Sequence, residues 1–290
     1  KYDGTITNTV TYPITRALYG HRIRQPIGGD FGVSGDLVRH YLTLDDWTED
    51  VSKFGIDIWM TTSALAGGYA VCQTRLGAKV HDPKDPGADL GPMFRQVVST
   101  ILRLAVEHAD RWLPVRGSHD VPAYGFERII DPPPLEVNAI RLLTEFHAGS
   151  LMLEDTWRRM IAPDNAETVL VLAREAGKLA DAARLKLGVT GDGGGTRQPT
   201  TLEMAEALAA FHFPDDLWAR VVYDLVVTAR GAADLAPLVA ALVPVYFGRV
   251  GSFVIENRHQ TSEQAEERVE RQAREFELLK GYLVDRWTRA

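Results

Sequence analysis

Three short segments carry ionisable side chains in settings that suit catalysis or metal binding. Asp30 stands in Gly28-Gly29-Asp30-Phe31-Gly32, where the flanking glycines leave its carboxylate open to a ligand. Asp57 lies among apolar residues at the expected start of a helix, where burial disfavours a charged carboxylate and the helix N-terminus favours it. His81 ends a short predicted strand, and a neutral imidazole is a good ligand for a metal ion. These residue types indicate acid–base or metal-assisted chemistry.

Each of the three residues also has an ordinary structural interpretation. Asp30 can be a turn aspartate, Asp57 a helix cap or a satisfied core carboxylate, and His81 a structural histidine. The Asp-Phe-Gly sequence at 30–32 occurs in protein kinases, but none of the other kinase motifs accompanies it. The acidic run at 45–50 resembles the magnesium motif of terpene cyclases, although no second metal motif follows in a later helix.

The elements expected to position these residues change in character near residue 110. Before it, we expect a helix at 54–66, short strands at 69–73 and 78–81, and a helix at 92–112 with an apolar helical period. Beyond it, the periodicity predicts helices at 136–150, 150–161, 166–187, 201–210, 215–229, 235–245 and 262–288. The predicted fold is therefore α/β over 1–110 and mostly α-helical over 111–290.

The composition excludes several classes of protein. The chain has 290 residues, of which 45% are hydrophobic and 24% charged, as in ordinary globular proteins. Its net charge of −7 disfavours non-specific nucleic-acid binding, which needs a basic face. Cys72 is the single cysteine, which excludes an internal disulfide and favours a cytoplasmic location. The longest apolar stretch, 235–247, contains two prolines and is short for a membrane span, so none is expected.

The predicted C-terminal helix alternates acidic and basic residues. Opposite charges lie three or four positions apart over 263–275, which predicts a solvated face with internal ion pairs. Val269, Phe276 and Leu283 mark the side expected to pack against the rest of the protein.

Five blocks follow one another in a fixed order between residues 4 and 98, and together they are more specific than any one of them. They comprise residues 4–7 (Gly-Thr-Ile-Thr), 25–31 (Gln-Pro-Ile-Gly-Gly-Asp-Phe), 54–58 (Phe-Gly-Ile-Asp-Ile), 76–81 (Leu-Gly-Ala-Lys-Val-His) and 90–98 (Leu-Gly-Pro-Met-Phe-Arg-Gln-Val-Val). Their order and spacing resemble the C-terminal half of the retaining GT-A glycosyltransferases that include glucosyl-3-phosphoglycerate synthase and mannosylglycerate synthase. The resemblance ends near residue 108.

The resemblance implies a UDP- or GDP-linked sugar donor whose diphosphate is bridged by Mg²⁺ or Mn²⁺. His81 matches the metal-binding histidine of the family. Asp57 matches an acidic residue at the sugar and acceptor site, and Asp30 matches the acid that frames the pocket; both are the expected catalytic residues. Acceptor-binding positions are expected at Gly4, Thr7, Gly29, Thr61 and Lys79.

Two departures concern the acceptor. Thr5 stands where the family has an arginine, and threonine offers no charged fork for a carboxylate or phosphate. Lys79 replaces a second arginine and loses two-pronged geometry. Arg16, Arg22 or Arg24 could compensate.

A third departure is that the Asp-x-Asp motif and nucleotide-binding strands lie upstream of these blocks in the family. We therefore expect a partner fragment to supply them. The expected activity is metal-dependent transfer of a hexose, with retention, to a small hydroxy acid such as glycerate or phosphoglycerate, by a homo-oligomeric protein. Two alternatives stay open: a non-catalytic binding or oligomerisation module derived from such an enzyme, and a helical prenyl-transfer enzyme.

Overall fold

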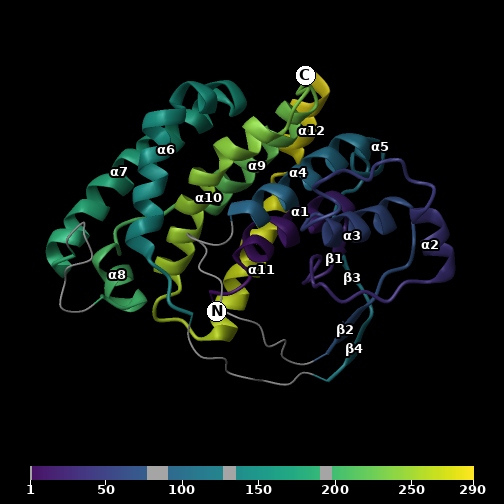
Figure 1. The fold of residues 1–290 in the computed structure, drawn as a ribbon, viewed down its shortest axis with the longest axis horizontal. Helices are drawn as coiled ribbons and strands as arrows, with labels where there is room; N and C mark the ends of the chain where they lie inside the picture. Colours follow the sequence, from purple (N-terminus) through teal and green to yellow (C-terminus); the bar gives the residue numbers. More distant parts are fainter. Residues whose placement is uncertain (1, 77–90, 127–134, 190–197) are drawn as a thin grey trace.

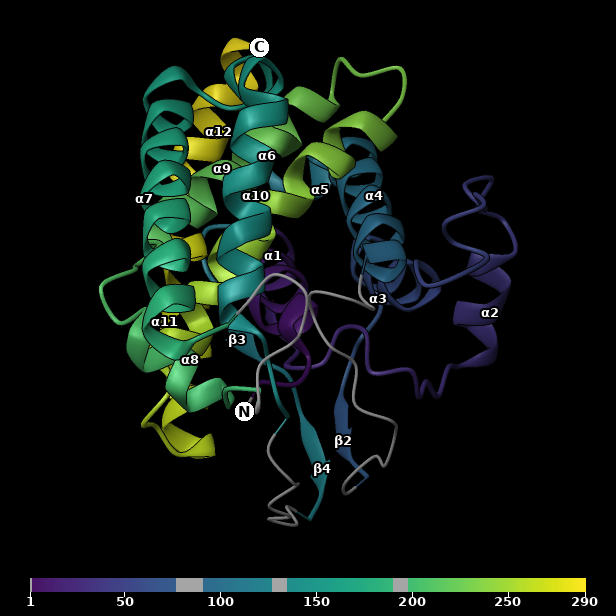
Figure 2. The same cartoon turned by 60° about the vertical axis from the view of Figure 1, so that its left-hand side comes forward.

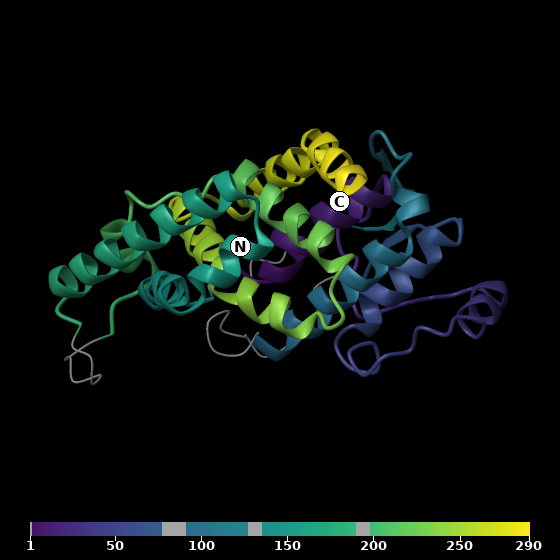
Figure 3. The ribbon, with the colours of Figure 1, turned by 90° about the horizontal axis from the view of Figure 1, so that it is seen from above.

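The computed structural model describes residues 2–76, 91–126, 135–189 and 198–290. Helices dominate these residues, and the short strands lie together at one edge (Figures 1 and 2). Seen from above in Figure 3, the α6–α8 helices occupy one end of an elongated molecule and the α2 helix the other. The C-terminal helices and α1 lie between them.

The N-terminal part consists mostly of short elements, and α4 is its longest helix. Its helices are η1 (Thr7–Thr11, a π-helix), α1 (Tyr12–Tyr19), α2 (Gly35–Tyr41), α3 (Ile56–Ala66), α4 (Gly91–Glu107) and α5 (Ala109–Trp112). The helix predicted at 54–66 is confirmed as α3, and the one predicted at 92–112 is divided between α4 and α5. The strand predicted at 69–73 begins only at Gln73, and the one at 78–81 lies outside the described residues.

The strands form two short parallel pairs. Strand β1 (His21–Arg22) pairs with β3 (His119–Asp120), and β2 (Gln73–Arg75) pairs with β4 (Ala123–Gly125). The side-chain amide of Gln73 donates to the Arg22 carbonyl at 3.2 Å and accepts from the Arg24 N–H at 2.7 Å. The backbone of a neighbouring strand would donate and accept in the same way, so the Gln73 side chain connects the β2–β4 pair to the residues at the end of β1.

These strands are too short to establish the sheet of a GT-A domain. Helices make up 66% of the described residues, and these residues give no sign of the GT-A fold. The α/β half therefore remains a prediction.

The C-terminal part is helical throughout its described residues. Its helices are α6 (Ala139–Met160), α7 (Pro163–Leu187), α8 (Thr201–Ala207), α9 (Asp215–Ala229), α10 (Ala236–Glu256), α11 (Ser262–Leu278) and α12 (Lys280–Arg289). Capping boxes at Thr200 and Thr261 begin α8 and α11, because each threonine and the residue three positions later satisfy one another's backbone N–H groups.

Three predicted helix boundaries in this part are wrong. The segments at 136–150 and 150–161 are one helix, α6. The helix predicted to end at 245 continues through Pro244 as α10, where Pro244 packs against Gly149 of α6. The helix predicted at 262–288 breaks near Leu279 into α11 and α12.

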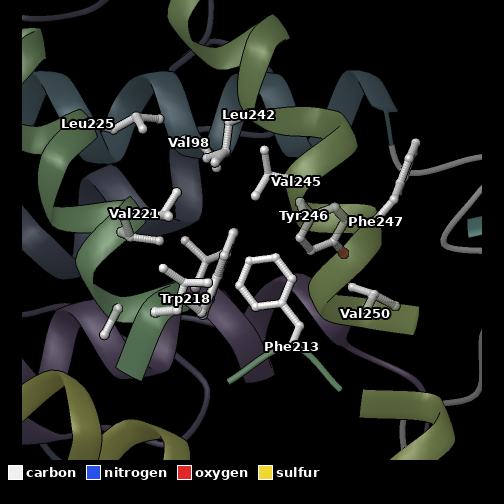
Figure 4. Packing of buried hydrophobic residues seen from close by; sticks show 14 of the residues in the cluster. Val98, Phe213, Trp218, Val221, Leu225, Leu242, Val245, Tyr246, Phe247 and Val250 are labelled. Atoms are coloured by element: carbon white, nitrogen blue, oxygen red, sulfur yellow. The ribbon is translucent and has the colours of Figure 1, made fainter. Parts of the chain in front are cut away.

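The main hydrophobic core draws on both sides of residue 110. It extends from Tyr2 to Trp287, and Figure 4 shows Val98 of α4 beside Leu242 of α10, and Trp218 of α9 beside Phe213. The two predicted domains therefore share a core.

Helix α10 is the most apolar element of this core. Its length and hydropathy meet the requirement for a membrane span, yet 72% of its most apolar stretch is buried inside the protein. Burial to this extent is typical of a helix in a protein core.

Candidate functional site

The Gly4–Thr7 block forms a turn that leads into the η1 π-helix. Gly4 has a φ of +68°, a conformation that favours glycine, and its N–H donates to the Asp3 carboxylate at 2.8 Å. The N–H of Asn8 then closes the turn onto the Gly4 carbonyl at 2.8 Å. Thr7 lies in η1 and is buried, whereas Gly4 is exposed. Helices of the π type are rare and often lie at functional sites.

Helices α9 and α11 complete the hydrogen bonding of η1. Pro13 has no N–H to donate. It therefore cannot make the π-helical hydrogen bond to the carbonyl of Asn8, five residues earlier, or the α-helical one to the carbonyl of Thr9, four residues earlier. The Gln272 side chain donates to the Asn8 carbonyl at 2.9 Å, and the Trp218 indole donates to the Thr9 carbonyl at 2.7 Å. The C-terminal helices thus satisfy the two carbonyls that Pro13 leaves without a donor.

Asn8 connects this turn to the segment after β1. Its side-chain oxygen accepts from Nη2 of Arg24 at 2.7 Å, and its side-chain nitrogen donates to the Asp3 carbonyl at 3.1 Å. Arg24 immediately precedes the Gln25–Phe31 block. The residue after the first family block therefore contacts the residue before the second.

Helix α3 holds the second block in place. The Thr61 hydroxyl donates to the Pro26 carbonyl at 2.8 Å in a buried position. Asp57 lies four residues before Thr61, hence on the same face of α3, and in its first turn, where the helix dipole favours a carboxylate. Asp57 is partly buried.

The loop after Pro26 turns through Gly29. Its φ of +78° again favours glycine, and Asp30 next to it is exposed.

Two hydrogen bonds therefore connect the segments that carry three of the five blocks: Asn8 to Arg24, and Thr61 to Pro26. Lys79 and His81 lie outside the described residues. Within the described part of the chain, no group of three His, Cys, Asp or Glu side chains is placed to hold a metal ion. A metal site of the family type would thus need His81 and carboxylates from elsewhere.

Thr5, which departs from the family pattern, and Arg16, which could compensate for it, are both engaged inside the protein. Thr5 is 1% exposed, and its hydroxyl lies 2.7 Å from the Tyr246 hydroxyl on α10. The Arg16 side chain is 4% exposed and pairs with Glu270 at 2.7 Å and Glu277 at 2.6 Å. Burial disfavours the charged form of Arg16, but Tyr12 and Glu277 outweigh it and raise the Arg16 pKa. Arg16 therefore joins α1 to α11.

The other two arginines are closer to the surface. Arg22 donates to the Ser118 hydroxyl at 3.0 Å and pairs with Asp120 at 3.3 Å. Arg24 pairs with Glu266 of α11 in addition to Asn8. Arg24 thus contacts Asn8, the residue that directly follows the Gly4–Thr7 block.

The acidic residues of α11 do more than form a solvated face. Glu266, Glu270 and Glu277 pair with Arg24 and Arg16, more than 240 residues away in sequence. Sequence reasoning missed these pairs, as well as Gln272 and Trp218, because helical spacing identifies partners within a helix but not across the fold.

Two shallow hollows lie away from these residues. One, of about 250 Å³, is lined by residues 256–271 of α10 and α11, and another, of about 200 Å³, lies between Asp50, α4 and the start of α10. Neither is lined by a predicted site residue.

No family model, curated protein or solved structure matches the chain at a significant level. The glycosyltransferase resemblance therefore rests on the five sequence blocks.

Proposed function

We propose that this chain supplies the acceptor side of a metal-dependent, retaining glycosyltransferase. The enzyme transfers a hexose from a UDP- or GDP-linked donor to a small hydroxy acid such as glycerate or phosphoglycerate. A nucleotide-binding half that carries an Asp-x-Asp motif completes the enzyme, the assembly is a homo-oligomer, and its location is cytoplasmic.

One observation carries this proposal beyond the sequence pattern. The Asn8–Arg24 and Thr61–Pro26 hydrogen bonds, at 2.7 and 2.8 Å, join the segments that carry three of the five family blocks. This proximity supports one shared site.

In this proposal each residue has a distinct task. Asp57, in the first turn of α3, orients the acceptor hydroxyl and the sugar, and Asp30 borders the pocket. The acceptor lies against Gly4, Thr7, Gly29, Thr61 and Lys79.

His81 is the residue of this chain that holds the metal. The metal, when bound, acts as a Lewis acid that neutralises charge on the leaving diphosphate. The sugar passes through a transition state with oxocarbenium character, as in glycoside chemistry. A carboxylate close to the sugar, such as Asp57, stabilises that positive charge.

Donor binding tests the proposal against the non-catalytic alternative. The chain, co-purified with its nucleotide-binding half, is titrated with UDP-glucose and with GDP-mannose in the presence of Mn²⁺. An enzyme binds one of them in a metal-dependent way, and His81→Ala weakens this binding about tenfold or more. The exposed His259→Ala serves as the matched control. A scaffold binds neither donor, and a prenyl-transfer enzyme binds a diphosphate without requiring a sugar.

A further inference from the structure

The guanidinium of Arg24 is held by a carboxylate through two parallel hydrogen bonds. Its Nε contacts Oε1 of Glu266, and its Nη2 contacts Oε2 of the same side chain at 2.8 Å. This two-pronged arrangement is the one by which arginine recognises a free carboxylate. Glu266 therefore occupies the position on Arg24 that an acidic ligand would take.

Arg24 is also fixed in orientation. Nη2 is shared with the Asn8 side chain at 2.7 Å, and the Tyr12 ring lies 5.3 Å from the guanidinium carbon. Nη1 is buried and has no hydrogen-bond partner among the described residues. An arginine held in this way keeps little conformational freedom, so a ligand that binds it costs little further side-chain entropy.

Two neighbouring ion pairs on α11 differ in how easily they exchange. The Arg16 side chain is only 4% exposed, although 45% of Glu270 and 17% of Glu277 are exposed, so its guanidinium offers no access to a ligand. In the Arg24 pair, by contrast, 25% of the arginine side chain and 49% of the Glu266 side chain are exposed. An exposed pair is worth only about 0–1 kcal/mol, because water solvates the separated charges well. Glu266 can therefore leave Arg24 at small cost.

We propose that Glu266 is an internal stand-in for the carboxylate of the acceptor. When the acceptor binds, its carboxylate displaces Glu266 from Arg24, and Nη1 is available as a further donor. Arg24 thereby takes over the task of the arginine that the chain lacks at Thr5. This inference rests on the proposed function, since it assigns the acceptor an acidic group and gives α11 a part in acceptor affinity.

The test measures binding of D-glycerate to the full chain by isothermal titration calorimetry, with glycerol as the neutral analogue. Glu266→Gln removes the competing carboxylate and is expected to tighten glycerate binding about three- to fivefold, the size of one exposed ion pair. Arg24→Gln abolishes glycerate binding, and Arg24→Lys weakens it because the fork is lost. Glycerol affinity is the same in all variants.

Matched controls keep the result interpretable. Glu263→Gln removes an exposed carboxylate from the first turn of the same helix and leaves glycerate affinity unchanged. Circular dichroism confirms that each variant is folded. Equal glycerate affinity in Glu266→Gln and the original chain overturns the inference, as does equal tightening in Glu263→Gln, which would reflect net charge alone.

Failure of this inference is distinguishable from failure of the proposed function. The binding measurement needs neither sugar donor nor metal. If glycerate binding depends on Arg24 and Glu266 but no sugar is transferred, the carboxylate site is supported and the glycosyltransferase activity is refuted. If sugar is transferred and Glu266→Gln leaves the acceptor KM unchanged, the activity is supported and the role of Glu266 is refuted.

Discussion

Replacing Gln272 by methionine tests whether α11 holds the π-helix of the candidate site. Methionine has a similar length, so the substitution leaves little cavity. It removes two buried hydrogen bonds, one to the Asn8 carbonyl at 2.9 Å and one to Nε of Arg249 at 2.8 Å. Gln272 is 2% exposed and Arg249 is fully buried, so water cannot replace either bond.

Each buried polar group left without a partner costs about 1–3 kcal/mol. The Gln272→Met variant is therefore expected to lose about 2–6 kcal/mol of the free energy of unfolding. The assay is urea denaturation followed by circular dichroism, with the denaturant midpoint and slope compared between variants. Arg271→Met, an exposed neighbour on the same helix, is the control and is expected to change stability by less than about 0.5 kcal/mol.

The Gln272→Glu variant separates the two bonds. A glutamate still accepts from Arg249, but it cannot donate to the Asn8 carbonyl and places a negative charge against it. We expect this variant to remain destabilised. A loss below about 1 kcal/mol in both variants would refute the view that Gln272 supports η1.

Three further predictions concern buried ionisable groups. Burial lowers the pKa of Lys280 from 10.5 to about 8, so the unfolded chain binds more protons between these values; stability should rise with pH from 8 to 10.5, and Lys280→Met should remove this rise in urea titrations. Burial works to raise the pKa of Glu256, but its ion pairs, led by Arg249, hold it well below 4.5; the stability that Glu256 contributes should be lost as the pH falls below 4.5, and this loss should be smaller in Glu256→Gln. Asp224 is fully buried and pairs with Arg286 at 2.8 Å, so Asp224→Ala should cost about 3–5 kcal/mol in the same denaturation assay.

Local sequence signals located most of the helices. The segment 215–229 was predicted with the bounds of α9, because its apolar period is uninterrupted and acidic residues begin it. Pro244 is the instructive failure. The helix was predicted to end at 245, just after this proline, but α10 continues to Glu256, and the packing of Pro244 against Gly149 of α6 is invisible in the sequence.

The candidate site was predictable only in part. Residue types and their setting drew attention to Asp30 and Asp57, the family resemblance added Thr61, and the structure has a hydrogen bond between Thr61 and the loop that leads to Asp30. The contributions of Trp218 and Gln272 could not be predicted, since they compensate for a missing N–H at Pro13 from more than 200 residues away. Long-range partners of this kind depend on tertiary packing and leave no periodic signal.

Detection of sugar transfer tests the central claim most directly. The chain and its nucleotide-binding half are incubated with a sugar nucleotide, Mn²⁺ and D-glycerate, and the anomeric configuration of the product is followed by NMR spectroscopy. The account predicts a glycoside of retained configuration whose rate of formation falls sharply in Asp57→Asn and His81→Ala but not in His259→Ala. Absence of a glycoside with every donor, or full activity in both site variants, would contradict it.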